Sequence, residues 1–149
     1  MKQELSQKTI DIIKESADLI SEKNIEITQK MYEILFKKNP QLKILFANAS
    51  ADQHIKLANT ISAYAHNIDQ LYKLEADLNI IALSHVNVKV RPDHYPIVGR
   101  AFINALEFVL VDDLDDEANI EFLDAWKEAY EYLAYILIDM EKKLYKQIN

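Results

Sequence analysis

The sequence predicts an all-α fold, and two observations carry that prediction. The chain of 149 residues contains one glycine and three prolines, whereas an all-β domain needs positive φ angles at many tight turns. Apolar residues recur at steps of three and four along most of the chain, which is the period of an amphipathic helix. Because the length suits one domain, we expect a single domain over residues 1–149 with about seven helices.

Four helices are expected in the N-terminal half. Ser6 is a suitable N-cap for the first helix, and a polar break at residues 21–24 separates it from the second. Pro40 ends the second helix, because the residue before a proline avoids the α region, and it opens a short third helix. A loop at residues 47–51 precedes the fourth helix, which begins near Asp52.

Three more helices are expected in the C-terminal half. One covers residues 71–88, and the next covers residues 95–110 after an opening at Pro92. The acidic segment 111–117 supplies negative charge to the N-terminus of the last helix. The last helix has the clearest pattern, an apolar stripe at alternating steps of three and four made of Leu123, Trp126, Tyr130, Leu133, Leu137, Met140 and Leu144.

Composition and charge exclude several classes of function. A chain with one glycine cannot build the glycine-rich loops that bind nucleotide phosphates. The formal net charge of −7 and the pI near 5.1 disfavour nucleic acid as a partner. The longest stretch without a charged residue, 57–68, is too short and too polar to span a membrane. Because there is no cysteine for disulfides or thiolate chemistry, we expect a cytoplasmic protein.

The four histidines, at positions 54, 66, 85 and 94, are the only obvious metal ligands. No two of them are three or four residues apart, and neither HExxH nor Glu-x-x-His occurs, which disfavours a zinc hydrolase and a di-iron bundle. His85 stands apart because it lies on an apolar helix face, one turn after Ile81. From spacing alone, a core or boundary histidine is the commoner explanation, and a single metal ligand is the alternative.

Five segments carry a resemblance to a known family by their residues and by their order along the chain. They are residues 6–10, 32–46, 84–88, 92–99 and the Leu-Asp-Ala-Trp segment 123–130. In this order they resemble the flavohaemoglobin family and its single-domain bacterial haemoglobin relatives. The resemblance implies a globin fold that encloses one haem b per chain, bound without a covalent link. Gly99, the only glycine, lies inside a predicted helix, where glycine costs about 1 kcal/mol relative to alanine and therefore indicates a close helix contact.

On the proximal side of the haem, the resemblance implies that His85 binds the iron. Tyr95 and Glu141 match the two residues that surround this imidazole, where a carboxylate would push electron density toward the iron. Ile81 and Val98 match residues that contact the haem. Without the resemblance, Glu141 would be interpreted as a solvated glutamate at the edge of its helix.

On the distal side, Tyr32 and Gln53 match the two hydrogen-bond donors beside the bound gas. Phe46 matches the phenylalanine that packs on the porphyrin, and Leu57 matches the apolar residue that limits the pocket. The loop before Gln53 is shorter than in the flavohaemoglobins, so His54 is the alternative residue to face the iron. Gln53 is preferred because it shares a helix face with Leu57.

The resemblance implies reversible dioxygen binding at ferrous iron, and conversion of nitric oxide to nitrate. Flavohaemoglobins continue into flavin and nicotinamide domains, so we expect that NO turnover by these 149 residues needs an external reductase. Whether the protein is an enzyme depends on that partner. Two alternatives remain open: a haem-based gas sensor or partner-binding module that uses the apolar stripe as an interface, and a helical module without haem.

Overall fold

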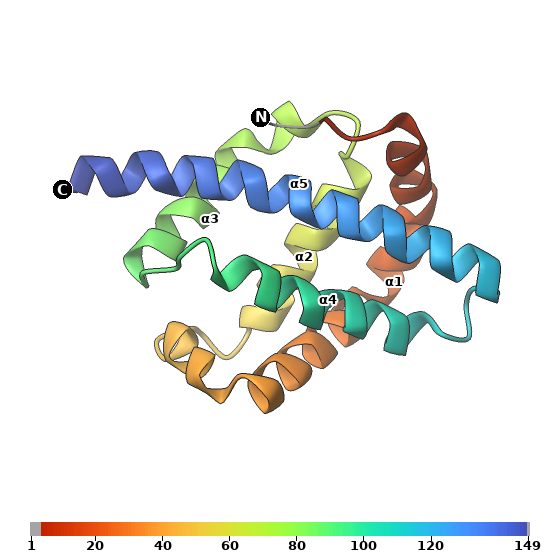
Figure 1. Ribbon diagram of the computed structural model, residues 1–149, viewed down its shortest axis with the longest axis horizontal. Coiled ribbons are helices and arrows are strands. Elements are labelled where there is room, and N and C mark those ends of the chain that lie inside the picture. The colour runs from red at the N-terminus through yellow and green to blue at the C-terminus, as the bar shows by residue number, and fades with distance from the viewer. Residues whose placement is uncertain (1–3, 149) are drawn as a thin grey trace.

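The computed structural model describes residues 4–148, and within that range the regular structure consists only of helices (Figure 1). The five α-helices are α1 (Gln7–Lys38), α2 (Gln53–His66), α3 (Glu75–Asn87), α4 (His94–Leu110) and α5 (Asp116–Ile148). Two short 3-10 helices, η1 (Pro40–Phe46) and η2 (Leu71–Leu74), precede α2 and α3. The all-α prediction is therefore confirmed.

The predicted break at residues 21–24 is wrong, because α1 is continuous from Gln7 to Lys38. Two polar side chains of this segment, Ser21 and Asn24, bind α2 instead of ending the helix. Asn24 Nδ2 donates to the Ala58 carbonyl oxygen at 3.3 Å and to Ser62 Oγ at 2.8 Å. The segment contains neither glycine nor proline, so its polar composition alone does not stop a helix whose neighbour satisfies the side chains.

Two other predicted helices have different boundaries. The predicted helix over residues 71–88 is divided, because η2 forms its first turn and α3 begins only at Glu75. Pro92 does not open the next helix but lies in a turn, and α4 begins at His94. The seven helical elements in the described range match the predicted number, although they divide the chain differently.

The core lies where α5 crosses the other helices. In Figure 1, α5 runs across the whole molecule, and it packs against α1, α3 and α4. Leu123, Trp126 and Leu137 of the predicted stripe are buried on it, while Ile13 and Ile20 of α1 are fully buried opposite. The apolar stripe of the last helix therefore faces the protein core along these positions.

The close helix contact predicted at Gly99 is present between α4 and α5. A Cβ atom added at Gly99 would lie 2.6 Å from Cε2 of Tyr130. Since real Cβ contacts do not come so close, only glycine leaves room for the Tyr130 ring where it lies against α4. The same ring stacks on Phe102, with ring centroids 6.1 Å apart. The space left by Gly99 thus allows an aromatic contact between α4 and α5.

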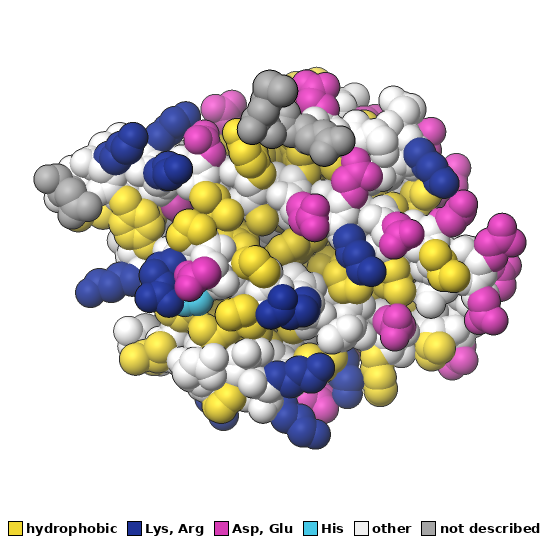
Figure 2. Space-filling model, viewed as in Figure 1, with side chains coloured by type: hydrophobic (Ala, Val, Ile, Leu, Met, Phe, Trp, Pro, Cys, Tyr) yellow, Lys and Arg dark blue, Asp and Glu magenta, His cyan; other side chains and the backbone are white. Residues whose placement is uncertain are grey.

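Charge is distributed unevenly over the surface. Residues 107–124, around the turn between α4 and α5, include eight acidic residues and no basic residue. Figure 2 shows these acidic side chains at one end of the molecule and Lys and Arg side chains near the C-terminal part of α5 at the other. None of the helices in residues 4–148 is long and apolar enough to cross a membrane.

Candidate functional site

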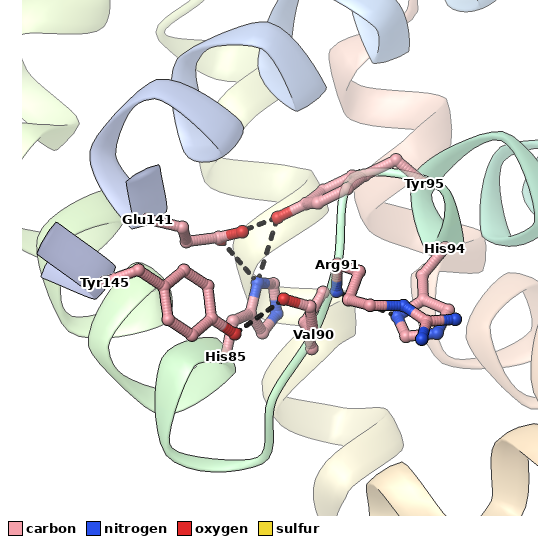
Figure 3. Close-up of polar contacts among 7 residues, drawn as sticks. All are labelled: His85, Val90, Arg91, His94, Tyr95, Glu141 and Tyr145. Atoms are coloured by element: carbon pink, nitrogen blue, oxygen red, sulfur yellow. Dashed lines mark hydrogen bonds and ion pairs between the residues drawn. The ribbon is translucent and has the colours of Figure 1, made fainter. Parts of the chain in front are cut away.

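The proximal residues predicted from the sequence come together from three helices (Figure 3). His85 lies in the last turn of α3, Tyr95 in the first turn of α4, and Glu141 near the end of α5. His85 Nδ1 lies 2.9 Å from Glu141 Oε2 and 3.0 Å from Tyr95 Oη. Tyr95 Oη donates to the same Glu141 oxygen at 2.7 Å. The Glu141 side chain is therefore a buried acceptor, with 3% of the residue exposed, and not a solvated edge residue.

This triad determines which nitrogen of His85 carries the proton. A carboxylate oxygen only accepts hydrogen bonds, and the Tyr95 hydroxyl already uses its proton toward Glu141. The short contact from Nδ1 to Glu141 therefore requires the proton on Nδ1. The lone pair of a neutral imidazole then lies on Nε2, which has no hydrogen-bond partner in residues 4–148. A neutral imidazole in this state is oriented to ligate a metal through Nε2.

Tyr95 remains a protonated donor in this arrangement. Burial raises the pKa of its hydroxyl far above the usual value, and the hydrogen bond and negative charge of Glu141 raise it further. The backbone at Tyr95 is also held, because Tyr130 Oη donates to the Tyr95 carbonyl oxygen at 2.7 Å. Both ends of Tyr95 therefore have fixed partners on α5.

Sequence reasoning missed a fourth residue on this side, Tyr145. Its hydroxyl donates to the Val90 carbonyl oxygen at 2.7 Å, in the turn that follows His85 (Figure 3). A usable signal was present in the sequence, because Tyr145 comes one helical turn after Glu141 and so lies on the same face of α5. What the sequence did not show is that this face meets residue 90.

The distal residues form a second group, built from α1, η1 and α2. The rings of Tyr32 and Phe46 meet edge to face with centroids 5.3 Å apart, and Phe36 contacts both rings. Burial raises the pKa of Tyr32, while a side-chain hydrogen bond with Gln53 lowers it by less. The structure thus brings Tyr32, Phe46 and Gln53 together, as the resemblance implied, with Leu57 half-buried one turn after Gln53.

The register of α2 brings Gln53, and not His54, near the hydroxyl of Tyr32. The Gln53 side chain lies close enough to the Tyr32 hydroxyl to lower its pKa. His54 contributes its main chain instead, since Thr28 Oγ1 donates to the His54 carbonyl oxygen at 2.8 Å. One residue along a helix turns a side chain by about 100°, so both cannot point toward Tyr32 in the same way.

A crevice separates α2, which carries Gln53 and Leu57, from α3, which carries His85. No Cα atom of α2 comes within 8 Å of one in α3 among the described residues. An apolar cavity of about 330 Å³ that opens to solvent occupies part of this space, and it is lined mainly by α2 and α3, with Leu133 from α5. Of the predicted haem contacts, Ile81 lines this cavity. Phe46, Leu57 and Val98 lie outside its lining and are half-buried against the core.

The comparisons with known proteins agree with this architecture. The family model described as Globin matches residues 29–137. A globin-like protein of Aquifex aeolicus is 48% identical over 143 residues, which cover 96% of this chain and 99% of that protein. A flavohemoprotein of Oceanobacillus iheyensis is 36% identical over 146 residues, and the match covers 96% of this chain but only 35% of the flavohemoprotein.

A solved structure shows the same arrangement of helices. It is an engineered carbene transferase made from a proposed nitric oxide dioxygenase of Rhodothermus marinus, with 32% sequence identity and a TM-score of 0.89. The superposition covers 97% of this chain and 98% of that one. With a family match over more than half of its length, the chain belongs to the globin family.

Proposed function

We propose that the chain binds one haem b, with His85 as the protein ligand of the iron, and that the haem-loaded protein binds dioxygen. The observation that carries this proposal is the triad of His85, Tyr95 and Glu141, which keeps the proton on Nδ1 and leaves Nε2 without a partner among the described residues. Among residues 4–148, no group of three or more His, Asp or Glu side chains is placed to hold a bare metal ion. A lone imidazole suits iron that a porphyrin already holds.

The apolar residues near the crevice suit a flat apolar group. Phe46, Leu57, Ile81 and Val98 are all half-buried and pack against the core with part of each side chain left accessible. Burying apolar surface of this kind contributes about 25 cal/mol per Å². We assign to these four side chains the role of packing against the porphyrin.

Glu141 and Tyr95 tune the iron ligand. An imidazole that donates from Nδ1 to a carboxylate gains anionic character and becomes a stronger electron donor through Nε2. The carboxylate is held in place because Tyr95 donates to the same oxygen at 2.7 Å. Such a ligand favours the ferric state and supports chemistry in which electron density moves toward the distal side.

Tyr32 and Gln53 act on the distal side as hydrogen-bond donors. Tyr32 keeps its proton at neutral pH, because burial raises the pKa of its hydroxyl. A hydroxyl and an amide that already lie near each other need little reorganisation to donate to a small polar ligand. We expect these bonds to slow the loss of dioxygen.

We further propose that the protein converts nitric oxide to nitrate when a separate reductase supplies electrons. When bound, the haem supplies the dioxygen site for the net reaction NO + O2 + e⁻ → NO3⁻. This net reaction consumes one electron per nitrate, and a flavin-containing reductase is a suitable donor. The proposal is supported by the flavohemoprotein relative and by the carbene transferase made from a proposed nitric oxide dioxygenase. A cytoplasmic location would provide such a donor.

Haem binding through His85 is tested by haem titration of the purified chain. Wild-type protein should give a Soret band that saturates at one haem per chain, and His85→Ala should bind haem at least tenfold more weakly. His66→Ala, a change at a side chain 45% exposed on α2, serves as the control and should bind as wild type does. No Soret band, or equal binding by His85→Ala, would reject the proposal.

The oxygenase claim needs a second assay, in which NO consumption and nitrate formation are followed with and without an added reductase. Nitrate should form over many turnovers only with the reductase. Haem binding without such turnover would leave a dioxygen-binding or sensing role and would reject the oxygenase claim.

A further inference from the structure

Tyr145 contacts the segment of chain that directly follows His85. Its hydroxyl donates to the Val90 carbonyl oxygen at 2.7 Å, and the Val90 N–H in turn donates to the His85 carbonyl oxygen at 2.9 Å. In a second backbone hydrogen bond, the Lys89 N–H donates to the Val86 carbonyl oxygen at 3.1 Å. These two backbone bonds form a Schellman motif, the common left-handed ending of an α-helix. The carbonyl of His85 is therefore bonded directly to this turn.

The turn is strained because the residue at its left-handed position is not glycine. Lys89 has φ = 65° and is the one non-glycine residue with positive φ in the described range. Residues with a Cβ atom avoid this conformation, and a Schellman turn usually places glycine there. A turn with this strain needs support from outside the helix, and the Tyr145 hydroxyl contacts it at Val90.

We propose that Tyr145 is a positioning residue for His85, which holds the main chain of the iron ligand while Glu141 holds its ring. This inference rests on the proposed role of His85 as the haem ligand. Glu141 fixes Nδ1, but the direction of Nε2 also depends on where the Cα atom of His85 lies. By fixing the Val90 carbonyl, Tyr145 keeps the turn closed and thus keeps the end of α3 in place.

The test compares Tyr145→Phe with wild type in the full chain as purified. The substitution removes only the hydroxyl, so the ring should remain packed. Amide hydrogen exchange at Val90 should become about 3- to 10-fold faster, as expected for the loss of one hydrogen bond that supports the turn. In the haem-loaded protein, haem loss should accelerate by a similar factor, and the iron–histidine stretching band of the ferrous form should shift or broaden.

Two further variants separate this role from general destabilisation. Tyr72→Phe, at a residue 73% exposed on η2, should change none of these measurements. Adding Lys89→Gly to Tyr145→Phe should restore much of the protection at Val90, because glycine adopts positive φ without strain. Failure of this rescue would overturn the role assigned to the turn.

Three results would overturn the proposal directly. The first is unchanged exchange at Val90, the second is faster Val90 exchange with unchanged haem loss, and the third is an equal acceleration at all core amides. If the chain bound no haem, the proposed function would fail, whereas the exchange data would still show whether Tyr145 holds the turn after His85.

Discussion

Replacing Glu141 with glutamine tests how the protein tunes its iron ligand. Both hydrogen bonds of the triad converge on one oxygen of Glu141, from Tyr95 Oη at 2.7 Å and from His85 Nδ1 at 2.9 Å. A glutamine carbonyl oxygen can accept both bonds from the same position. Glu141→Gln therefore removes a buried charge while the shape of the site and the number of acceptors at that point are retained.

The size of the effect follows from the hydrogen bond to the imidazole. A hydrogen bond to a charged group contributes about 1.5–3 kcal/mol, and a neutral one about 0.5–1.5 kcal/mol, so the charge accounts for about 1 kcal/mol. Ferric iron makes the imidazole N–H more acidic, which strengthens its bond to the carboxylate more than ferrous iron does. Losing the charge should therefore raise the ferric/ferrous midpoint potential by up to about 40 mV, on a scale of 59 mV per tenfold change for one electron.

The assay is a spectroelectrochemical titration of the haem-loaded protein. Asp139→Asn is the matched control, because it lies on α5, changes the net charge equally and is 52% exposed, so its potential should remain near that of wild type. An unchanged or lowered midpoint in Glu141→Gln would refute the reasoning. An equal rise in Asp139→Asn would show that net charge, and not the triad, sets the potential.

Three further predictions concern packing, the distal site and acid stability. Gly99→Ala should lower the free energy of unfolding by about 1–2 kcal/mol in urea titrations, because the new Cβ displaces Tyr130 and the strain exceeds the gain in helix propensity. Tyr32→Phe should accelerate dioxygen dissociation about 5- to 100-fold in stopped-flow measurements, since it removes a hydrogen bond of about 1–3 kcal/mol. Glu128→Gln should make the free energy of unfolding fall less steeply at acid pH. Burial raises the pKa of Glu128, but hydrogen bonds from Thr9 and from the N-cap of α1 lower it by more, so the folded state favours the ionised carboxylate. That stabilisation is complete above the ordinary value of 4.5 and is lost as pH falls through the lower pKa of the folded state.

Controls for these variants come from exposed positions on the same helices. Asn104→Ala on α4 should leave the free energy of unfolding within about 0.5 kcal/mol of wild type. Glu131→Gln on α5 should keep the wild-type pH profile. An unchanged dioxygen off-rate in Tyr32→Phe would reject its role as a donor, and an unaltered acid profile in Glu128→Gln would reject the contact between α5 and the start of α1 as a source of acid sensitivity.

The helical faces could be predicted from the sequence because they depend on periodicity alone. Leu123, Trp126 and Leu137 repeat at helical spacing, and they are buried as that spacing indicates. Gly99 was informative for a related reason, since a glycine inside a helix is costly unless another group needs the space. The break at residues 21–24 was mispredicted because the bonds of Asn24 to α2 are tertiary, and no local pattern reveals them.

In the candidate site, too, local patterns could be predicted from the sequence and tertiary contacts could not. The triad residues come from positions 85, 95 and 141, and only a resemblance across nearly the whole chain suggested that they belong together. Spacing on one helix could have added Tyr145 to Glu141, but not its partner at Val90. The positive φ of Lys89 was also hidden, because lysine gives no sign of a left-handed turn as glycine would.

The contacts of α5 explain why the proximal side can be rigid although α3 is short. Tyr130, Glu141 and Tyr145 follow one another at spacings of eleven and four residues, which are close to three turns and one turn of a helix. One face of α5 therefore holds three points of the same segment: the Tyr95 carbonyl, the ring of His85 and the carbonyl of Val90. α5 packs on α1, α3 and α4, so the segment from His85 to Tyr95 is held in place through α5 by the core. The distal residues come from α1, η1 and α2, and none of them takes part in these bonds. The two faces of the proposed haem site can therefore vary independently: changes on α5 act on the iron ligand, and changes near Tyr32 act on the gas.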